Sequence, residues 1–302
     1  MKTAIKRTVG ERIIFSIVFV ILAIYALFIL YHFYFLLQLA TKSYLDFDNA
    51  ILYNTYGTWS TGENFKLSNL YESINYFKVK VLRNNLPATV SFLELTFNSI
   101  WFAIGSEVIV LLFQSCATYV ICKYDFKGKS FLYNLVIVRM MVPIVGTLPS
   151  AYKAYKMIGL IDSPLILLTA TDVLGGANFL ILYAFFKGIS WDYAEAAFID
   201  GASHFQVYFK IMLQMALPAI SVLFITGFIG RWNEYLNISI FMPNLPTLSY
   251  GLYIYKSQNE YSGADFPKYF SAVFLAAIPC ITLFIIFQNS IMQTVHFGGI
   301  KG

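Results

Sequence analysis

The sequence predicts an all-α integral membrane protein with six transmembrane helices. Of its 302 residues, 58% are hydrophobic and only 12% are charged, whereas about a quarter of the residues in a soluble domain are charged. The mean hydropathy is +0.65. The apolar residues are gathered in six long stretches separated by polar segments. This hydrophobicity is typical of membrane spans and not of a soluble core.

Charge and cysteine content exclude two other classes of protein. The net charge of +5 is spread along the chain, and no basic run alternates with exposed aromatic residues, so we expect no nucleic-acid partner. The cysteines Cys116, Cys122 and Cys280 lie in apolar stretches without metal-ligand spacing. We therefore expect no metal site.

The first element is a basic flank followed by a long apolar run. Residues 1–12 carry four Lys and Arg residues and are predicted to form a cytoplasmic N-terminus. Residues 13–41 contain no charged side chain over 29 positions, more than the roughly 20 needed to cross a bilayer. The apolar core of a cleaved secretory signal has only about 7–15 residues, so we expect this helix to be retained as the first span.

A polar segment and five further spans follow. Residues 42–94 are predicted to form an external loop with short structure of its own, because residues 42–87 are rich in charge, Tyr and Asn. Residues 95–293 form a predicted five-helix core, and residues 294–302 a cytoplasmic tail. The predicted spans of the core are residues 95–122, 130–152, 163–186, 211–230 and 269–295. The prolines of the span at 130–152 are expected to kink or end its helix.

Three charged residues, Glu107, Arg139 and Asp172, fall inside predicted spans. A charge at the bilayer centre costs at least about 2.5–3.5 kcal/mol, so each should face a partner, a cavity or the water edge. One interpretation is a polar lining for a solute passage, with Arg139 paired to an acid. The other is packing within the helix bundle, or a span end that lies a few residues away from its predicted place.

The segment at residues 191–218 combines charge, small residues and a glycine turn between two apolar runs. Asp192 and Glu195 have the spacing of a capping box at a helix N-terminus. Gly201 should end that helix, because glycine adopts left-handed backbone geometry without steric penalty. A second short helix over residues 203–210 should then lead into the next span. The result is a predicted helix–turn–helix at one membrane face.

This segment resembles the EAA motif of ABC importer permeases. The resemblance lies in Glu195-Ala196-Ala197 followed by Gly201 and, nine residues later, Ile211 and Leu213, and the run Asp200-Gly201-Ala202-Ser203 is similar to carbohydrate permeases of the maltose type. In that family the segment is a cytoplasmic coupling helix that docks into a groove on the ATPase subunit. The chain departs from the family at Gln214, where proline is usual. The resemblance implies that the residues contacting the ATPase are Glu195, Ala196, Ala197, Asp200, Gly201 and Ala202.

Two further elements are similar to the same family. Residues 230–235 contain Trp232, Asn233 and Glu234 in the family's G-x-W-N-acid-aromatic order. We treat these three residues, like the charges within the spans, as either pathway or structural groups. The C-terminal run resembles the tail of maltose-type permeases that reaches into the ATPase dimer, and its matching residues are Gly298, Gly299, Ile300, Lys301 and Gly302. The resemblance extends over residues 95–302.

The resemblance implies an ABC type I importer permease fold in a bacterial inner membrane. It implies as partners a homologous second permease, two ATPase subunits and an extracytoplasmic substrate-binding protein, with a sugar or oligosaccharide as solute. ATP and Mg²⁺ would be bound by the ATPase subunits, so this chain would need no cofactor and would catalyse no reaction. Gly128-Lys129-Ser130 matches only the end of a P-loop, because Lys123 stands where the loop needs glycine.

Charge distribution gives the orientation. With both termini inside, the predicted inner segments carry ten Lys and Arg in 50 residues, and the outer segments carry ten in 94. The short loops and the first helix, which dominate the positive-inside rule, favour the same orientation.

Three alternatives stay open. The chain could be an ABC permease for a non-sugar solute. An ion-coupled secondary transporter would show repeat symmetry with broken helices, and we find no internal repeat. A membrane enzyme would need an acid–base cluster at one membrane face, and the sequence shows none.

Overall fold

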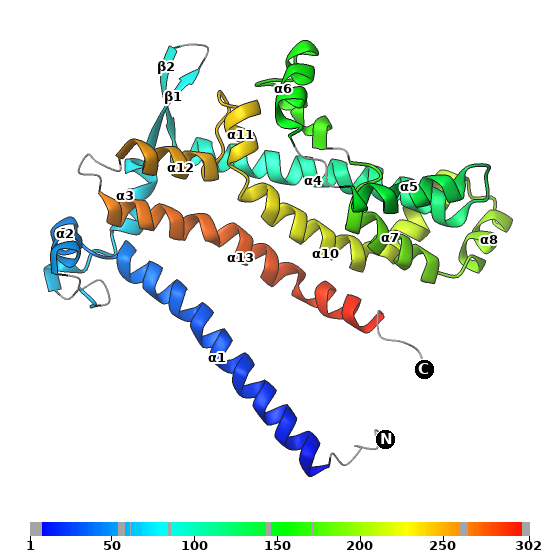
Figure 1. The fold of residues 1–302 in the computed structure, drawn as a ribbon, viewed down its shortest axis with the longest axis horizontal. Coiled ribbons are helices and arrows are strands. Elements are labelled where there is room, and N and C mark those ends of the chain that lie inside the picture. The colour runs from blue at the N-terminus through cyan, green and yellow to red at the C-terminus, as the bar shows by residue number, and fades with distance from the viewer. Residues whose placement is uncertain are drawn as a thin grey trace. The chain divides into compact units, whose positions relative to one another are not determined.

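A computed structural model describes residues 8–53, 58–60, 62–83, 86–142, 146–170, 172–259 and 265–297, with side chains up to residue 288 except at residues 170 and 259. The described chain is helical except for one hairpin (Figure 1). It divides into two compact units, which comprise residues 1–77 with 260–275, and residues 78–259 with 276–302.

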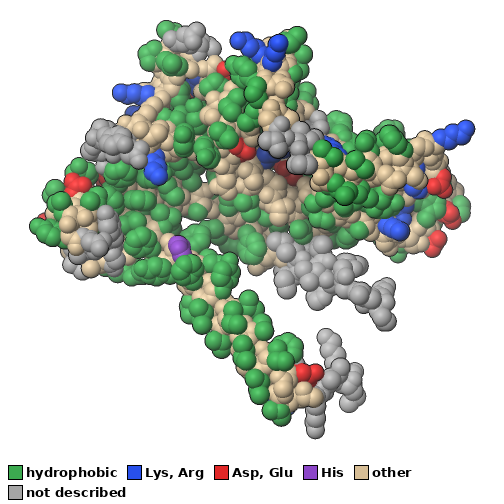
Figure 2. All heavy atoms as spheres, in the orientation of Figure 1, with side chains coloured by type: hydrophobic (Ala, Val, Ile, Leu, Met, Phe, Trp, Pro, Cys, Tyr) green, Lys and Arg blue, Asp and Glu red, His purple; other side chains and the backbone are tan. Residues whose placement is uncertain are grey.

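The first unit contains the long N-terminal helix and a small polar layer. Its elements are α1 (Val9–Ala40), α2 (Tyr44–Tyr53), the 3-10 turn η1 (Gly62–Asn64), α3 (Asn69–Tyr76) and the beginning of α13 (Phe266–Phe297). A capping box between Thr8 and Glu11 starts α1. Hydrophobic side chains cover α1, and most of them are exposed (Figure 2). Such a helix has the length and surface of a membrane span.

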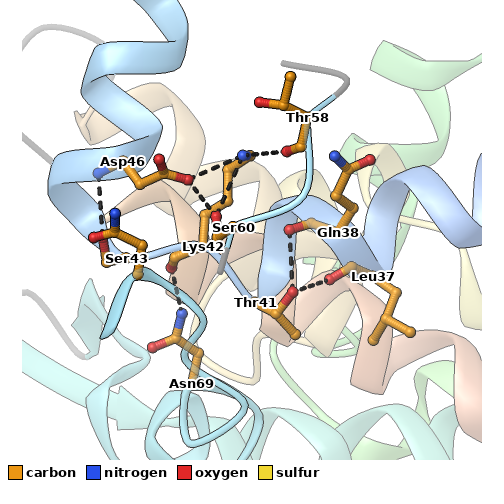
Figure 3. Close-up of polar contacts among 10 residues, drawn as sticks. Leu37, Gln38, Thr41, Lys42, Ser43, Asp46, Thr58, Ser60 and Asn69 are labelled. Atoms are coloured by element: carbon orange, nitrogen blue, oxygen red, sulfur yellow. Dashed lines mark hydrogen bonds and ion pairs between the residues drawn. The ribbon is translucent and has the colours of Figure 1, made fainter. Parts of the chain in front are cut away.

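A buried lysine ties the end of α1 to the polar layer (Figure 3). The side chain of Lys42 is 1% exposed, and its ammonium donates to Oδ2 of Asp46 at 3.0 Å and to the carbonyl oxygen of Thr58 at 2.7 Å. Asn69 donates to the carbonyl oxygens of Ala40 and Lys42 at 2.9 and 2.8 Å. These bonds satisfy carbonyl groups that the end of a helix leaves without partners.

The second unit holds the hairpin and the helical core. Its elements are β1 (Lys78–Arg83), β2 (Leu86–Ser91), α4 (Phe92–Lys123), α5 (Lys129–Met141), α6 (Leu148–Met157), η2 (Pro164–Ala170), α7 (Gly176–Gly188), α8 (Asp192–Ile199), α9 (His204–Val207), the π-helical turn η3 (Tyr208–Met212), α10 (Leu213–Trp232), α11 (Leu236–Phe241), α12 (Leu248–Asn259) and the rest of α13. Helices α4, α7 and α10 pack against one another and form its centre (Figure 1). The strands pair antiparallel, with Lys80 opposite Thr89.

Four helices of the described chain are long and apolar enough to cross a membrane: Val9–Ala40, Phe92–Lys123, His204–Trp232 and Phe266–Gln288. The first covers the predicted span 13–41 up to Ala40, the second contains the span 95–122, and the third contains the span 211–230. The fourth covers the span 269–295 up to Gln288. The prediction of a purely α-helical chain overlooked the hairpin. Its period-two alternation of lysine and valine was the signal that could have revealed it.

The predicted spans at 130–152 and 163–186 are not single helices. The first is divided into α5 and α6, as its prolines led us to expect. Pro149 lies in the first turn of α6, where proline is tolerated, and Gly146 has a left-handed φ of +79°. The second consists of η2 and α7, and Gly176, the first residue of α7, has a φ of +46°. A residue with positive φ cannot continue an α-helix. Hydrophobicity alone therefore overestimated the length of both helices.

Candidate functional site

The predicted helix–turn–helix is present as α8, a glycine turn and α9. The expected cap at Asp192 is wrong: Trp191 occupies the N-cap position with helical dihedral angles and makes no side-chain cap bond. Asp192 is instead the first helical residue, and its N–H donates to Oγ of Ser190 at 3.3 Å. Asp192 and Glu195 both lie in the first turn of α8, where negative charge interacts favourably with the helix dipole.

Gly201 ends α8 in the left-handed conformation that the sequence predicted, with φ +83°. The N–H of Gly201 donates to the carbonyl oxygen of Phe198 at 3.0 Å, and that of Ala202 to the carbonyl oxygen of Ala197 at 2.9 Å. This pair of bonds is a Schellman motif, in which the residue after the cap must have positive φ. The turn therefore depends on the glycine at this position.

A capping box that sequence reasoning missed starts α9. Oγ of Ser203 accepts from the N–H of Gln206 at 3.4 Å, and Oε1 of Gln206 accepts from the N–H of Ser203 at 2.8 Å. The S-x-x-Q spacing was a sufficient signal for it. Helix α9 passes into α10 through the π-helical turn η3, and Gln214, which stands where the family usually has proline, is the second residue of α10.

The helix–turn–helix is anchored on its inner side and exposed on its outer side. Ala194 and Val207 are fully buried in an apolar cluster with Met212. Tyr208 extends the anchor to α4 through a 2.8 Å contact between its hydroxyl and Oγ of Ser115. The opposite face is exposed at Glu195, Ala196, Ile199, Asp200 and Gly201, whereas Ala197 and Ala202 are half-buried. The exposed motif residues thus share a face that no other part of the described chain covers.

The charged residues predicted within spans come together in the second unit. Arg139 of α5 forms an ion pair with Asp172, and its Nη2 lies 2.9 Å from Oδ2 of Asp172. Glu107 of α4 is only 3% exposed. Its carboxylate lies against Gly227 of α10, where a Cβ would collide with it.

Two adjoining cavities contain these groups. One, of about 390 Å³, is lined by Glu107, Val110, Gln114, Asp172, Gly175, Asn178, Gly227, Gly230, Arg231 and Glu234. The other, of about 350 Å³, lies among Thr147, Leu148, Tyr155 and Asn237 and shares Asp172 and Arg231 with the first. Both volumes are in the range of roughly 300–1,000 Å³ typical of small-molecule sites.

The three residues of the W-N-acid element differ in their surroundings. Trp232 is buried and its Nε1 donates to the carbonyl oxygen of Ala276 in α13 at 3.0 Å. The side chain of Asn233 donates to the carbonyl oxygen of Ile229 at 2.9 Å and so caps the end of α10. Glu234 accepts from the N–H and Nδ2 of Asn237 at 3.1 and 3.0 Å and also lines the larger cavity. The geometry gives Trp232 and Asn233 structural contacts and leaves a pathway role open only for Glu234.

The predicted tail residues Gly298, Gly299, Lys301 and Gly302 lie outside the described residues.

Four helices long and apolar enough to cross a membrane indicate a membrane-embedded protein, and its second unit contains two cavities with polar lining. The chain belongs to the family of binding-protein-dependent transport system inner membrane components, whose family model matches residues 115–296. It is therefore a permease component of an ABC import system and not an enzyme. The matched residues include the helix–turn–helix and most of the lining of both cavities.

Similar proteins are named as permeases. The chain is 26% identical over 204 residues to the diacetylchitobiose uptake system permease protein NgcG of Streptomyces coelicolor. The aligned residues make up 67% of this chain and 67% of NgcG. It is 30% identical over 209 residues to the arabinooligosaccharides transport system permease protein AraQ of Bacillus subtilis, covering 68% of this chain and 73% of AraQ.

A solved structure shares the fold. It is a chain of a bacterial ABC transporter involved in the import of the acidic polysaccharide alginate, with a TM-score of 0.70 and 18% sequence identity over 95% of this chain and 99% of that one. At this identity the similarity shows the fold alone.

Proposed function

We propose that this chain forms one half of the membrane passage of an ATP-driven importer for a sugar or oligosaccharide. The observation that carries the proposal is the family match over residues 115–296, together with relatives named for the uptake of diacetylchitobiose and arabinooligosaccharides. The polar cavities supply the kind of surface that a hydroxylated solute needs inside an apolar helix bundle.

The membrane topology that we propose has six crossings with both termini in the cytoplasm. Four crossings are the long helices, and the other two are the broken segments α5–α6 and η2–α7. Helix α5 has 13 residues, which at 1.5 Å per residue gives roughly 20 Å, less than the 30 Å of hydrocarbon. Non-helical backbone at membrane depth is tolerated where it borders protein or a water-filled cavity. Asp172, between η2 and α7, borders both cavities.

In this proposal α8 is the coupling helix and faces the ATPase in the cytoplasm. Its support is the exposed face with Glu195, Ala196 and Asp200, beside Ile199, whose side chain is 86% exposed. A large apolar side chain exposed to this degree among acidic residues suits a partner surface. The partners that we propose are two ATPase subunits at this face, a homologous permease in the membrane and a substrate-binding protein outside.

The mechanism is alternating access driven by the ATPase. Closure of the ATPase dimer on ATP and Mg²⁺ would move α8. Tyr208 and the buried cluster below α8 and α9 would transmit this movement to α4 and α10. Because α4 and α10 carry Glu107, Gly227 and Arg231 on the walls of the larger cavity, their movement would change which side of the membrane that cavity faces.

Gly201 tests the coupling role. In Gly201→Val, a β-branched residue would occupy a left-handed position, which costs an L-residue about 1–2 kcal/mol or more. We expect uptake and co-purification of the ATPase to fall about tenfold. The variant should still insert in the membrane, because the turn lies outside the spans.

The matched control is Gly201→Asn, because asparagine tolerates left-handed geometry and no atom lies within 4 Å of the position that its Cβ would occupy. Uptake and ATPase binding close to wild type are expected for this variant. Normal coupling in the valine variant would rule out the proposed role of the turn.

A further inference from the structure

Two buried acceptor atoms on α4 have no hydrogen-bond partner. Oε1 of Glu107 is one, and Oε1 of Gln114 is the other. The two residues are seven positions apart on one helix, so they lie on the same face two turns from each other. Their side chains are almost wholly buried, with 3% and 2% exposure. Buried polar atoms normally find a partner, so each of these acceptors indicates a missing donor.

Both residues line the larger cavity, and contacts with neighbouring elements hold their side chains there. Nε2 of Gln114 donates to the carbonyl oxygens of Asp172 and Gly175 at 3.2 and 2.8 Å, which fixes the amide with its oxygen unpaired. Glu107 occupies the space left by the missing side chain of Gly227. The glycine at this point of α10 therefore makes room for the carboxylate.

The charges around the cavity favour a ligand without negative charge. Asp172 is neutralised by its ion pair with Arg139. The remaining ionisable groups of the lining are Glu107 and Glu234, which oppose one arginine, Arg231. A carboxylate or sulfate on the ligand would therefore meet two acidic side chains and a single arginine at short range.

The chemistry of the ligand follows from the groups that lack partners. Oxygen acceptors need hydrogen-bond donors. Hydroxyl groups are such donors. A neutral polyhydroxylated compound supplies several such donors at once.

We propose that Glu107 and Gln114 form a hydroxyl-binding subsite for a neutral sugar within this chain's own part of the passage. The inference rests on the proposed function and deepens it, because it assigns solute contacts to this permease and distinguishes neutral from acidic sugars. Glu107 accepts from hydroxyl groups of the sugar and disfavours uronic acids, Gln114 accepts from a second hydroxyl, and Gly227 keeps the carboxylate in position.

Occupancy of the cavity can be measured directly in the assembled importer. Asn178 lines the same cavity, so Asn178→Cys in a variant without the three native cysteines places a thiol beside the subsite. The complex in proteoliposomes would be labelled with a small thiosulfonate, with millimolar maltose, cellobiose or digalacturonate as probes. We expect at least one neutral disaccharide to slow labelling severalfold and digalacturonate to leave it unchanged.

The carboxylate is tested by Glu107→Gln, which keeps the size of the side chain but replaces one acceptor by a donor. In the Asn178→Cys background, we expect the protection by the neutral disaccharide to be lost and turnover of sugar transport to fall about tenfold. Glu63→Gln, at an exposed position of the first unit, is the matched control and should keep both. Yield and ATPase content of the purified complex would show that each variant assembles.

The outcomes separate this inference from the proposed function. If the wild-type importer takes up no sugar, the proposed function fails. If it takes up a neutral sugar while Glu107→Gln keeps full protection and turnover, the subsite is wrong and the proposed function stands. Equal protection by digalacturonate in the wild type would overturn the preference for neutral sugars.

Discussion

At the scale of single residues, the buried lysine of the first unit shows how one side chain organises a polar layer. Burial by itself would raise the pKa of Asp46, but the hydrogen bonds from Ser60 and Lys42 outweigh burial and lower the pKa of this carboxyl below its ordinary value. A depressed pKa means that the ionised carboxylate stabilises the folded state above the ordinary pKa of Asp near 4. That contribution is lost as the pH falls through the lowered pKa.

We predict that Lys42→Met lowers the free energy of unfolding of the first unit by about 1–3 kcal/mol, because it leaves the acceptors of Asp46 and Thr58 without their donor. Breaking a fully buried pair would cost about 3–5 kcal/mol, but the side chain of Asp46 is 26% exposed. Thermal denaturation of the purified complex at neutral pH measures the loss.

Lys66→Met, at an exposed position, is the control and should leave the melting temperature unchanged. The difference between Lys42→Met and wild type should shrink as the pH falls below the ordinary pKa of Asp, near 4, and through the lowered pKa of Asp46. A difference that persists undiminished in acid would show that the lysine acts by packing alone.

At the scale of elements, two residues near the beginning of α4, Asn98 and Ser99, form hydrogen bonds with the chain at the start of α12. Nδ2 of Asn98 donates to the carbonyl oxygen of Pro246 at 3.0 Å, and Oγ of Ser99 accepts from the N–H of Leu248 at 2.7 Å. Leu248 is the first residue of α12, so Ser99 caps that helix from a neighbouring one. Gly251 then packs directly against Leu95 of α4.

We predict that Ser99→Ala destabilises the protein by about 1–3 kcal/mol, because the buried N–H of Leu248 loses its acceptor. Ser130→Ala changes an exposed serine of α5 and should have no measurable effect. Thermal denaturation of the two purified variants makes the comparison. Equal melting temperatures would show that another group or water replaces the serine.

The elements also show what a sequence can predict. The first span, the second span and the glycine turn at Gly201 were predictable, because apolar run length and left-handed geometry are local properties. The interruption within 163–186 was missed because the stretch as a whole is apolar, although Asp172 and the pair Gly175-Gly176 mark the place where its helix is broken. The subsite was beyond prediction because Glu107 meets Gly227 across 120 positions, and only the packing of α4 on α10 brings them together.

At the scale of the whole molecule, the proposed orientation places the hairpin outside the cell and α8 inside. The chain offers an exposed side chain on each: Lys80 in β1 and Tyr193, 53% exposed, in α8. Among the described residues, neither side chain makes a hydrogen bond or an ion pair; the carbonyl oxygen of Lys80 accepts from Nε2 of Gln258 at 3.3 Å, a backbone contact that a cysteine would keep. Each can therefore be replaced by cysteine, after removal of the three native cysteines, without disturbing the fold.

We predict that a membrane-impermeant maleimide labels Lys80→Cys in intact cells, whereas Tyr193→Cys is labelled only after the membrane is permeabilised. The reason is that α4, a helix of 32 residues and so roughly 48 Å long, begins directly after the hairpin and crosses the bilayer once. It therefore brings its C-terminal end, next to α9, to the opposite face. Labelling of Tyr193→Cys from outside would place the predicted coupling helix where no ATP is available. It would then contradict both the orientation and the ATPase contact, while the cavity and its acceptors would remain as described.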